Sequence, residues 1–298
     1  MKISTASFYD RAATRMSDLN AKSERLLTEI SGKKLVTPSQ DAGGWSRLGA
    51  IKQGGADDGA YKANITLAQG LLAQTDGVLG SASDQIVRAR ELAVRANSGT
   101  LTVEAKAAIA TELKDIRADL LALANTTDVR GVPVFGGGTD TPFTETDGVV
   151  GFAVGAASAV IPTGEGTSVA VGADGGRVFG GAEGAADIFA TLDALTLALT
   201  TDGADVPAAV ATALTAIGAV EGQVTTARAS AGARAARLDI EAARIESAGI
   251  DREEARVAIE ETDVPTAMVE LQKTMTVLQA TQAGVAKLSG LSLFDYLR

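Results

Sequence analysis

The chain has 298 residues, enough for about two domains, and a formal net charge of −10 from 27 basic and 37 acidic side chains. It has no cysteine and no histidine, which excludes disulfides, zinc sites of the usual kind, thiol nucleophiles and Ser–His–Asp triads. The acidic balance argues against nucleic-acid partners, and aromatic residues make up only 4% of the chain, too few for large stacking platforms.

The first residues do not read as a secretory signal, because no apolar segment precedes the charged pair Asp10 and Arg11. No stretch approaches the roughly 18 apolar residues that a membrane span needs. We therefore expect a chain that is not inserted in a membrane and that carries no cleaved signal peptide.

Composition divides the chain into three parts. Residues 1–127 and 186–298 are rich in Ala, Leu, Arg and Glu, whereas residues 131–185 are rich in Gly, Val, Thr and Phe. Helix formers therefore flank a segment of strands and turns. We expect a mainly α-helical fold, a long coiled-coil hairpin or bundle with paired N- and C-terminal helices and a small β-rich insert.

The helical flanks carry an apolar repeat of 3.5 residues, which predicts long helices that supercoil in a left-handed sense. In residues 62–98 a large row and a small row alternate: Ile65, Leu72, Leu79, Ile86 and Ala93, then Ala68, Thr75, Ala82, Ala89 and Ala96. Further stripes predict helices around 8–30, 109–123, 210–245 and 264–285. We expect Thr102 to cap the helix that follows the break at Ser98 and Gly99.

The two terminal stripes need partners. A helix of about 25 residues with one apolar face is marginal alone, so the helix over 8–30 should pair with the helix over 264–290. Even that pair would leave apolar surface exposed, and neighbouring copies could bury it. The sequence therefore predicts a subunit that stacks or polymerises.

The middle segment is predicted to form short strands at residues 132–135, 149–154, 159–161 and 168–171. The dipeptides Asp147-Gly148 and Asp174-Gly175 are typical of two-residue hairpin turns, because both residue types tolerate a positive φ. We expect at most a small sheet that rests on the helices.

The search for chemistry finds no catalytic or cofactor constellation. The glycines at 172–181 lack the Lys-[Ser/Thr] ending of a phosphate loop, and adjacent carboxylates on a helix diverge by about 100° and do not share a site. Arg234 and Arg237, three residues apart, are expected to pair with acidic neighbours rather than to bind phosphate. We therefore predict no enzymatic activity, no cofactor and no metal.

Several segments carry, in order along the chain, a recognisable pattern. They are 1–5, 26–34 with 38–41, 88–96, 122–126 and 231–238. Together they resemble the flagellin superfamily of bacterial axial proteins, although Gln40 stands where the family signature has the first of two Asp residues. The segment 131–137 and the ending 291–297 resemble most the branch that joins hook to filament.

The resemblance implies a structural flagellar subunit at the hook–filament junction. Residues 1–43 with 263–298 would form an inner coiled-coil domain, 44–130 with 186–262 a helical rod domain, and 131–185 an outward-facing insert. Implied partners are further copies in a ring or helical array, flagellin, the other hook-associated junction protein and an export chaperone on the C-terminal helix. The implied location is extracellular, in the flagellum, after type III export.

The resemblance also implies that the functional residues are interfacial and lie at the two ends of the chain. Two alternatives stay open: a filament-forming or minor flagellin, and an outward-facing module for glycan adhesion carried by residues 131–185. The expected assembly residues are Phe8, Leu19, Leu26, Ile30, Val264, Met268, Leu271, Met275, Leu278, Val285, Leu291, Phe294 and Leu297.

Overall fold

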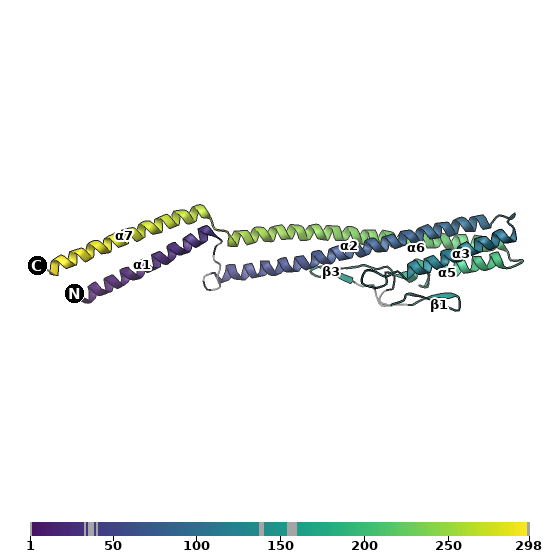
Figure 1. Ribbon diagram of the computed structural model, residues 1–298, viewed down its shortest axis with the longest axis horizontal. Helices are drawn as coiled ribbons and strands as arrows, with labels where there is room; N and C mark the ends of the chain where they lie inside the picture. Colours follow the sequence, from purple (N-terminus) through teal and green to yellow (C-terminus); the bar gives the residue numbers. More distant parts are fainter. Residues whose placement is uncertain are drawn as a thin grey trace. The chain divides into compact units, whose positions relative to one another are not determined.

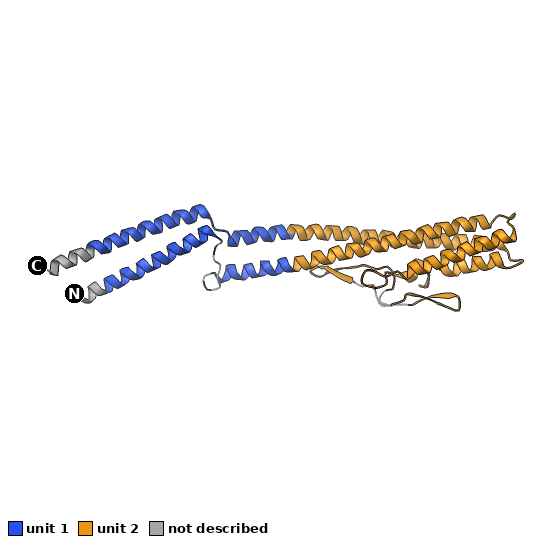
Figure 2. Ribbon diagram, viewed as in Figure 1, with its two compact units in different colours: residues 1–56, 248–298 blue, residues 57–247 orange. Residues whose placement is uncertain are grey.

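The computed structural model describes residues 2–32, 34, 39, 41–136, 140–153 and 160–296. It divides into two compact units, residues 1–56 with 248–298 and residues 57–247 (Figure 2). Each unit combines segments from both halves of the sequence, as the similar composition of the two flanks predicts. The expected fold class, mainly helical with a small strand-containing insert, is confirmed.

The first unit pairs the two ends of the chain. Helix α1 (Lys2–Ser31) lies along α7 (Val264–Tyr296), as the terminal stripes predict (Figure 1). The unit also contains the beginning of α2 (Ala42–Ala96) and the end of α6 (Val206–Glu260). Asp41 caps α2, because its Oδ1 accepts a hydrogen bond from the backbone N–H of Gly44 at 2.7 Å.

The second unit is a bundle in which α2 and α6 lie side by side with α3 (Val103–Ala124) and α5 (Ile188–Thr200) (Figure 1). Ion pairs cross between the two long helices, from Arg228 to Asp76 at 2.8 Å and from Arg90 to Glu221 at 2.9 Å. These pairs lie at the surface, so each contributes little to the free energy of folding. They help to fix how α2 and α6 are aligned along their length.

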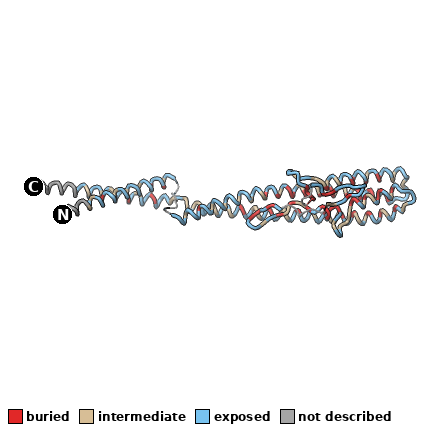
Figure 3. Tube along the Cα trace, turned by 90° about the horizontal axis from the view of Figure 1, so that it is seen from below, coloured by how far each residue is buried: buried red, intermediate tan, exposed pale blue. Residues whose placement is uncertain are grey.

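The 3.5-residue repeat is confirmed as the core of this bundle. Both predicted rows on α2 are buried from Ile65 to Ala96, and α6 presents a matching heptad row to them (Figure 3). The small residues of the second row permit close helix approach. The buried heptad row on α6 consists of Val210, Ile217, Val224, Ala231, Leu238 and Ile245.

The predicted cap of α3 is also confirmed. The side chain of Thr102 accepts a hydrogen bond from the backbone N–H of Ala105 at 3.2 Å, which satisfies one of the free donors of the first turn. At the other end, the backbone N–H of Asn125 donates to the carbonyl of Leu121 at 3.2 Å.

The insert consists, in its described part, of two separate antiparallel hairpins rather than one sheet. Strand β1 (Phe143–Thr146) pairs with β2 (Val149–Phe152), and β3 (Val160–Gly164) pairs with β4 (Thr167–Ala170). The turn at Asp147 and Gly148 is confirmed, since their φ angles of 53° and 82° fit the left-handed geometry of a tight hairpin.

Two sequence predictions for the insert were wrong, and one strand was missed. Residues 132–135 form a turn with an isolated bridge between Thr127 and Pro133, because proline cannot donate to a ladder. Asp174 does not form a hairpin turn but caps the short helix α4 (Gly175–Phe179), accepting from the N–H of Arg177 at 3.3 Å. Strand β1 was not predicted at all.

Four buried phenylalanines join the insert to the bundle. The rings of Phe135 and Phe143 lie 5.2 and 5.9 Å from that of Phe179, and Phe143 lies 5.6 Å from Phe189 of α5. Gly175 fits beneath them only because it lacks a side chain, since a Cβ there would lie 2.8 Å from the Phe143 ring. These rings are enclosed and cannot stack on a sugar.

One 18-residue window between Val206 and Lys287 has a mean hydropathy of 1.2 and few charges, so by length and composition it could cross a membrane. The sequence analysis did not find this window, and the core helices of proteins outside membranes pass the same test.

Candidate assembly surfaces at the paired chain ends

The contact between α1 and α7, here called the terminal seam, is built from two heptad rows. On α1 it buries Ala12 and Leu26, with Leu19 partly buried between them. On α7 the residues that face the seam follow steps of four and three, which is the spacing of a coiled coil. These residues are Ala267, Leu271, Thr274, Leu278, Thr281 and Val285.

Charges flank the seam and add to the contact between its helices. Lys22 of α1 lies 2.6 Å from Glu270 of α7, and the hydrogen bond from Lys22 lowers the pKa of that carboxyl below its usual value. On α1, Arg25 donates to Glu29 at 2.9 Å. Both partners of the Lys22–Glu270 pair are about half exposed, so the pair contributes little to stability.

Six of the predicted assembly residues line this seam and are buried or partly buried by it. They are Leu19, Leu26, Ile30, Leu271, Leu278 and Val285. Their apolar surface is therefore used, at least in part, to pair the chain's own ends.

Four other predicted residues are more exposed: Phe8 is 42% exposed, Val264 40%, Met268 57% and Met275 46%. Phe8 and Val264 lie at the ends of the seam rows, and Phe8 lines a hollow with Ala12, Thr281 and Val285. Met268 and Met275 lie on a neighbouring face of α7. The sequence stripe on α7 therefore combined two faces of the helix. Its true second row is made of Ala267, Thr274 and Thr281, whose seven-residue spacing could have revealed it.

The first unit exposes large apolar side chains on more than one side of α7. Met268 and Met275, seven residues apart, share one exposed face of α7, whereas Val269 and Val277, which are 68% and 45% exposed, lie on other sides of the helix, and on α1 Leu27 is 52% exposed. A hollow of about 380 Å³ on the side of Val277 is lined by Leu19, Val269 and Val277 among others. Nothing else in the described part of the chain covers these side chains.

The last three predicted residues fall where the structure gives no side chains. The backbone of Leu291 and Phe294 is part of α7, whose described helix ends at Tyr296, but the positions of their side chains lie outside the described set. Leu297 lies outside the described residues altogether.

Two arginines of the second unit fix the insert to the bundle. The side chain of Arg117, buried in α3, lies 3.1 Å from Glu145 and 2.7 Å from Asp193, and it donates to the carbonyl of Gly148 at 3.0 Å. Arg234 was predicted to pair with a carboxylate, and this was wrong. Its Nη1 instead donates to the carbonyls of Ala170 and Gly172, each at 2.8 Å, because β4 ends directly over this part of α6.

The described residues contain no arrangement that suggests catalysis. Within them, no three Asp or Glu side chains gather closely enough to hold a metal ion. The carboxylates with lowered pKa values owe them to structural contacts, such as the hydrogen bond from Arg228 to Asp76 and that from Arg244 to Glu241. These carboxylates are held in ion pairs with arginines of neighbouring helical turns or helices.

Two family descriptions match the two flanks of the chain. "Bacterial flagellin N-terminal helical region" matches residues 3–139, and "Bacterial flagellin C-terminal helical region" matches residues 214–297. The matches cover the helices of both units and leave out most of the insert.

Two individual relatives agree with this family assignment. The chain is 28% identical over 321 residues to flagellar hook-associated protein 3 of Escherichia coli K12, covering 99% of each chain. It is 32% identical over 138 residues to flagellar hook-associated protein 3 of Salmonella typhimurium, covering 46% of this chain and 44% of that one.

Solved structures have the same fold. A putative flagellar hook-associated protein from Vibrio parahaemolyticus superposes with a TM-score of 0.69 at 20% identity, covering 74% of this chain and 99% of the other. The flagellar junction protein FlgL from Legionella pneumophila gives 0.56 at 16% identity, covering 72% and 99%. From the two flanking matches, the full-length relative and the shared fold, the chain belongs to the flagellin superfamily of flagellar structural proteins and, within it, to the hook-associated junction branch.

Proposed function

We propose that this chain is the structural subunit that joins the flagellar hook to the filament. The observation that carries this proposal is the match to a hook-associated protein over 99% of both chains. The terminal seam supports it, because it holds the chain ends together while leaving a row of apolar side chains exposed. A subunit built in this way is completed by its neighbours.

In this proposal, assembly buries the exposed face of the first unit. Phe8, Val264, Met268 and Met275 would contact neighbouring subunits, whereas the seam residues act by holding the paired helices in place. We extend the proposed contacts to Leu291, Phe294 and Leu297 at the end of the chain. We also retain the division into an inner coiled-coil domain (1–43 with 263–298), a rod domain (44–130 with 186–262) and an outward-facing insert (131–185).

The proposed partners are further copies of this chain, flagellin and the other hook-associated junction protein. An export chaperone would cover the apolar face of α7 before assembly, since that face would otherwise be exposed in the cell. Export would use the flagellar type III apparatus without a cleaved signal peptide. We propose no enzymatic role, because membership of a structural family and the lack of histidine and cysteine favour none.

A clean deletion strain, examined by electron microscopy together with its culture medium, tests the proposal. We expect intact hooks without filaments and unpolymerised flagellin in the medium, with both defects restored by the gene in trans. Filaments that persist or merely shorten would instead assign the chain to the minor flagellins. Immunogold labelling of restored cells separates the two functions independently, since a junction subunit marks one short zone and a flagellin marks the filament.

A further inference from the structure

A hollow of about 870 Å³ opens in the second unit, away from the terminal seam. Its floor is the face of α6 that carries the small residues Gly222, Thr226 and Ser230, and its wall is formed by α4 and the loop that follows it. Gln223 holds that wall in place, because its side chain accepts from the N–H of Ala186 at 2.7 Å and donates to the Val178 carbonyl at 3.2 Å.

Arg234 lines this hollow with a positive charge that no carboxylate in the described part of the chain neutralises. Its Nε donates to the carbonyl of Ser230 and its Nη1 to two backbone carbonyls of the insert. The Nη2 group has no acceptor among the described residues. A guanidinium has five N–H donors and keeps its charge, and burial lowers the pKa of Arg234, so a carboxylate at Nη2 would stabilise it.

Two acidic residues also line the hollow. Asp174 is held by α4, since it accepts from the N–H of Arg177 at 3.3 Å and lies 3.5 Å from the Nε of that residue. Glu183 is exposed on the loop and would weakly oppose an entering anion. Arg177, the other cation in the lining, already lies against Asp174, so a carboxylate that enters the hollow is expected to be bound where it reaches Arg234 directly.

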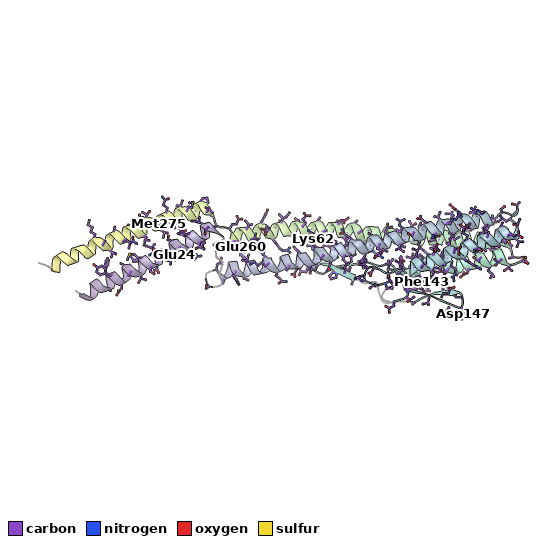
Figure 4. The ribbon with its side chains drawn as sticks, viewed as in Figure 1. Glu24, Lys62, Phe143, Asp147, Glu260 and Met275 are labelled. Atoms are coloured by element: carbon purple, nitrogen blue, oxygen red, sulfur yellow. The ribbon has the colours of Figure 1, made fainter. Side chains whose placement is uncertain are left out.

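The same unit presents a carboxylate that suits this hollow. Asp147 lies at the tip of the β1–β2 hairpin (Figure 4), with a positive φ of 53° and with no hydrogen bond or ion pair to the rest of the described chain. Val149 beside it is 69% exposed. Arg117 holds the tip rigidly through Glu145 and the carbonyl of Gly148.

We propose that the hairpin tip of one copy enters the Arg234 hollow of a neighbouring copy, where the Asp147 carboxylate accepts hydrogen bonds from Nη2 of Arg234. The contact is heterologous, so repeating it links copies into a ring or a helical array. It rests on the proposed function and identifies one partner surface as a second copy of this chain.

Size and position favour this tip over the other acidic turns. The two-residue turn at Asp147 and Gly148 ends the hairpin in a narrow tip. Asp202 lies in a turn between two helices, and Glu165 raises the pKa of its own neighbour Arg244 through its charge. Arg117 contacts Glu145 and Gly148 of the hairpin as well as Asp193 of α5, and it holds the tip where Asp147 does not line the hollow of its own chain.

Cysteine cross-linking tests the contact directly, because the natural chain has no cysteine. The double variant Asp147→Cys with Thr226→Cys is expressed in the deletion strain, and flagella with attached hooks are oxidised and run on a non-reducing gel. A disulfide needs Cα atoms about 4.4–6.8 Å apart, so a ladder of covalent oligomers forms only if the tip reaches the hollow. Asp202→Cys with Thr226→Cys is the matched control, from which we expect no ladder.

A charge exchange gives a second measurement that leaves Arg234 in place. Asp147→Lys and Ser230→Glu should each reduce the number of attached filaments about tenfold, as expected for breaking a close charge pair, and the two together should restore attachment. Ala229→Glu adds the same charge outside the hollow and should have no effect. No ladder from flagella that keep their filaments, or no mutual rescue, overturns the proposal.

The two proposals fail in different ways. If gold labelling finds the chain along the whole filament, the junction function is wrong, while a ladder from the same filaments would still establish the contact between hairpin and hollow. If the label is confined to the junction and neither ladder nor rescue is observed, the junction function stands and the hairpin contact is wrong.

Discussion

The side chain of Asn125 and the backbone of Phe143 exchange two hydrogen bonds. Nδ2 of Asn125 donates to the carbonyl of Phe143 at 2.9 Å, and the N–H of Phe143 donates to Oδ1 at 3.0 Å. The residue that ends α3 thus takes the place of a strand partner for β1. It fixes the position from which the Phe143 ring enters the buried aromatic cluster.

Asn125→Ala should lower the free energy of unfolding by about 1–3 kcal/mol, because it leaves two part-buried backbone groups of Phe143 without partners. Equilibrium denaturation of the full chain measures the change. Asn97→Ala is the matched control, since Asn97 is exposed just beyond α2, and a change there within about 0.5 kcal/mol is expected. Equal losses from both variants would contradict the role of Asn125.

Arg117 should stabilise the folded chain more through the hydrogen bond that holds the hairpin than through its charge. Burial alone would lower its pKa, but Glu145 and Asp193 raise it above the usual value, so the guanidinium stays charged at 11% side-chain exposure. Arg117→Met should cost about 1–3 kcal/mol, mostly from the lost hydrogen bond to Gly148 and from the freed hairpin. Both carboxylates are 43% exposed and can be hydrated, which limits the loss.

A double-mutant cycle measures how much of the stability lost in Arg117→Met comes from the ion pair between Arg117 and Asp193. Asp193→Asn alone, Arg117→Met alone and both together are compared by denaturation. A coupling of about 0.5–1.5 kcal/mol between the two residues is expected, and additive losses would show that their contact adds no stability.

Two leucines of the same bundle should differ sharply in how much stability their replacement by alanine costs, because one is buried and the other is exposed. Leu113 of α3 is fully buried, whereas Leu197 of α5 is 66% exposed. Leu113→Ala should therefore cost about 2–5 kcal/mol through lost burial and a residual cavity, whereas Leu197→Ala should change stability by about 0.5 kcal/mol or less. Thermal unfolding of the two variants provides the comparison, and a similar shift for both would contradict this placement of the core.

The pairing of α1 with α7 should weaken slightly in acid. Lys22 lowers the pKa of Glu270 in the folded chain, so the unfolded state binds the proton more readily. The stabilisation is therefore present above the unfolded pKa near 4.5 and is lost as the pH falls through the lower folded value. Glu270→Gln should lower the helix melting midpoint at pH 7 and have a smaller effect at pH 3. An equal effect at both pH values would contradict the linkage.

The sequence predicted the helices well because their signal is repeated many times. Ten consecutive positions from Ile65 to Ala96 follow the 3.5-residue spacing, and all ten are buried. A repeat of this length leaves few alternative structures. The same argument explains why the pairing of the two chain ends could be expected from their stripes.

The insert was predicted less well because contacts distant in sequence determine its structure. β1 has only four residues and is fixed by Asn125, eighteen positions earlier. Asp174-Gly175 forms a helix start rather than a hairpin, with Asp174 as the cap and with Phe143 packed over Gly175. Neither contact leaves a local signature. Among the assembly candidates, Met268 and Met275 were grouped with the seam because the true row, Ala267 and Thr274, is small or polar.

The two faces of α7 should separate folding from assembly. Leu271 faces α1, so Leu271→Glu places a charge in the terminal seam and should reduce the pairing of α1 with α7, seen as faster amide exchange in both helices. Met275 is 46% exposed, so Met275→Glu should leave the exchange of the free subunit unchanged. If the exposed face contacts neighbouring subunits, Met275→Glu should nevertheless abolish filament attachment in the deletion strain. Ala280→Glu adds the same charge at an exposed position about 140° around α7 from Met275, and it separates a specific contact from a general effect of charge. Normal attachment with Met275→Glu would show that this face is not an assembly surface, whatever the fate of the seam variant.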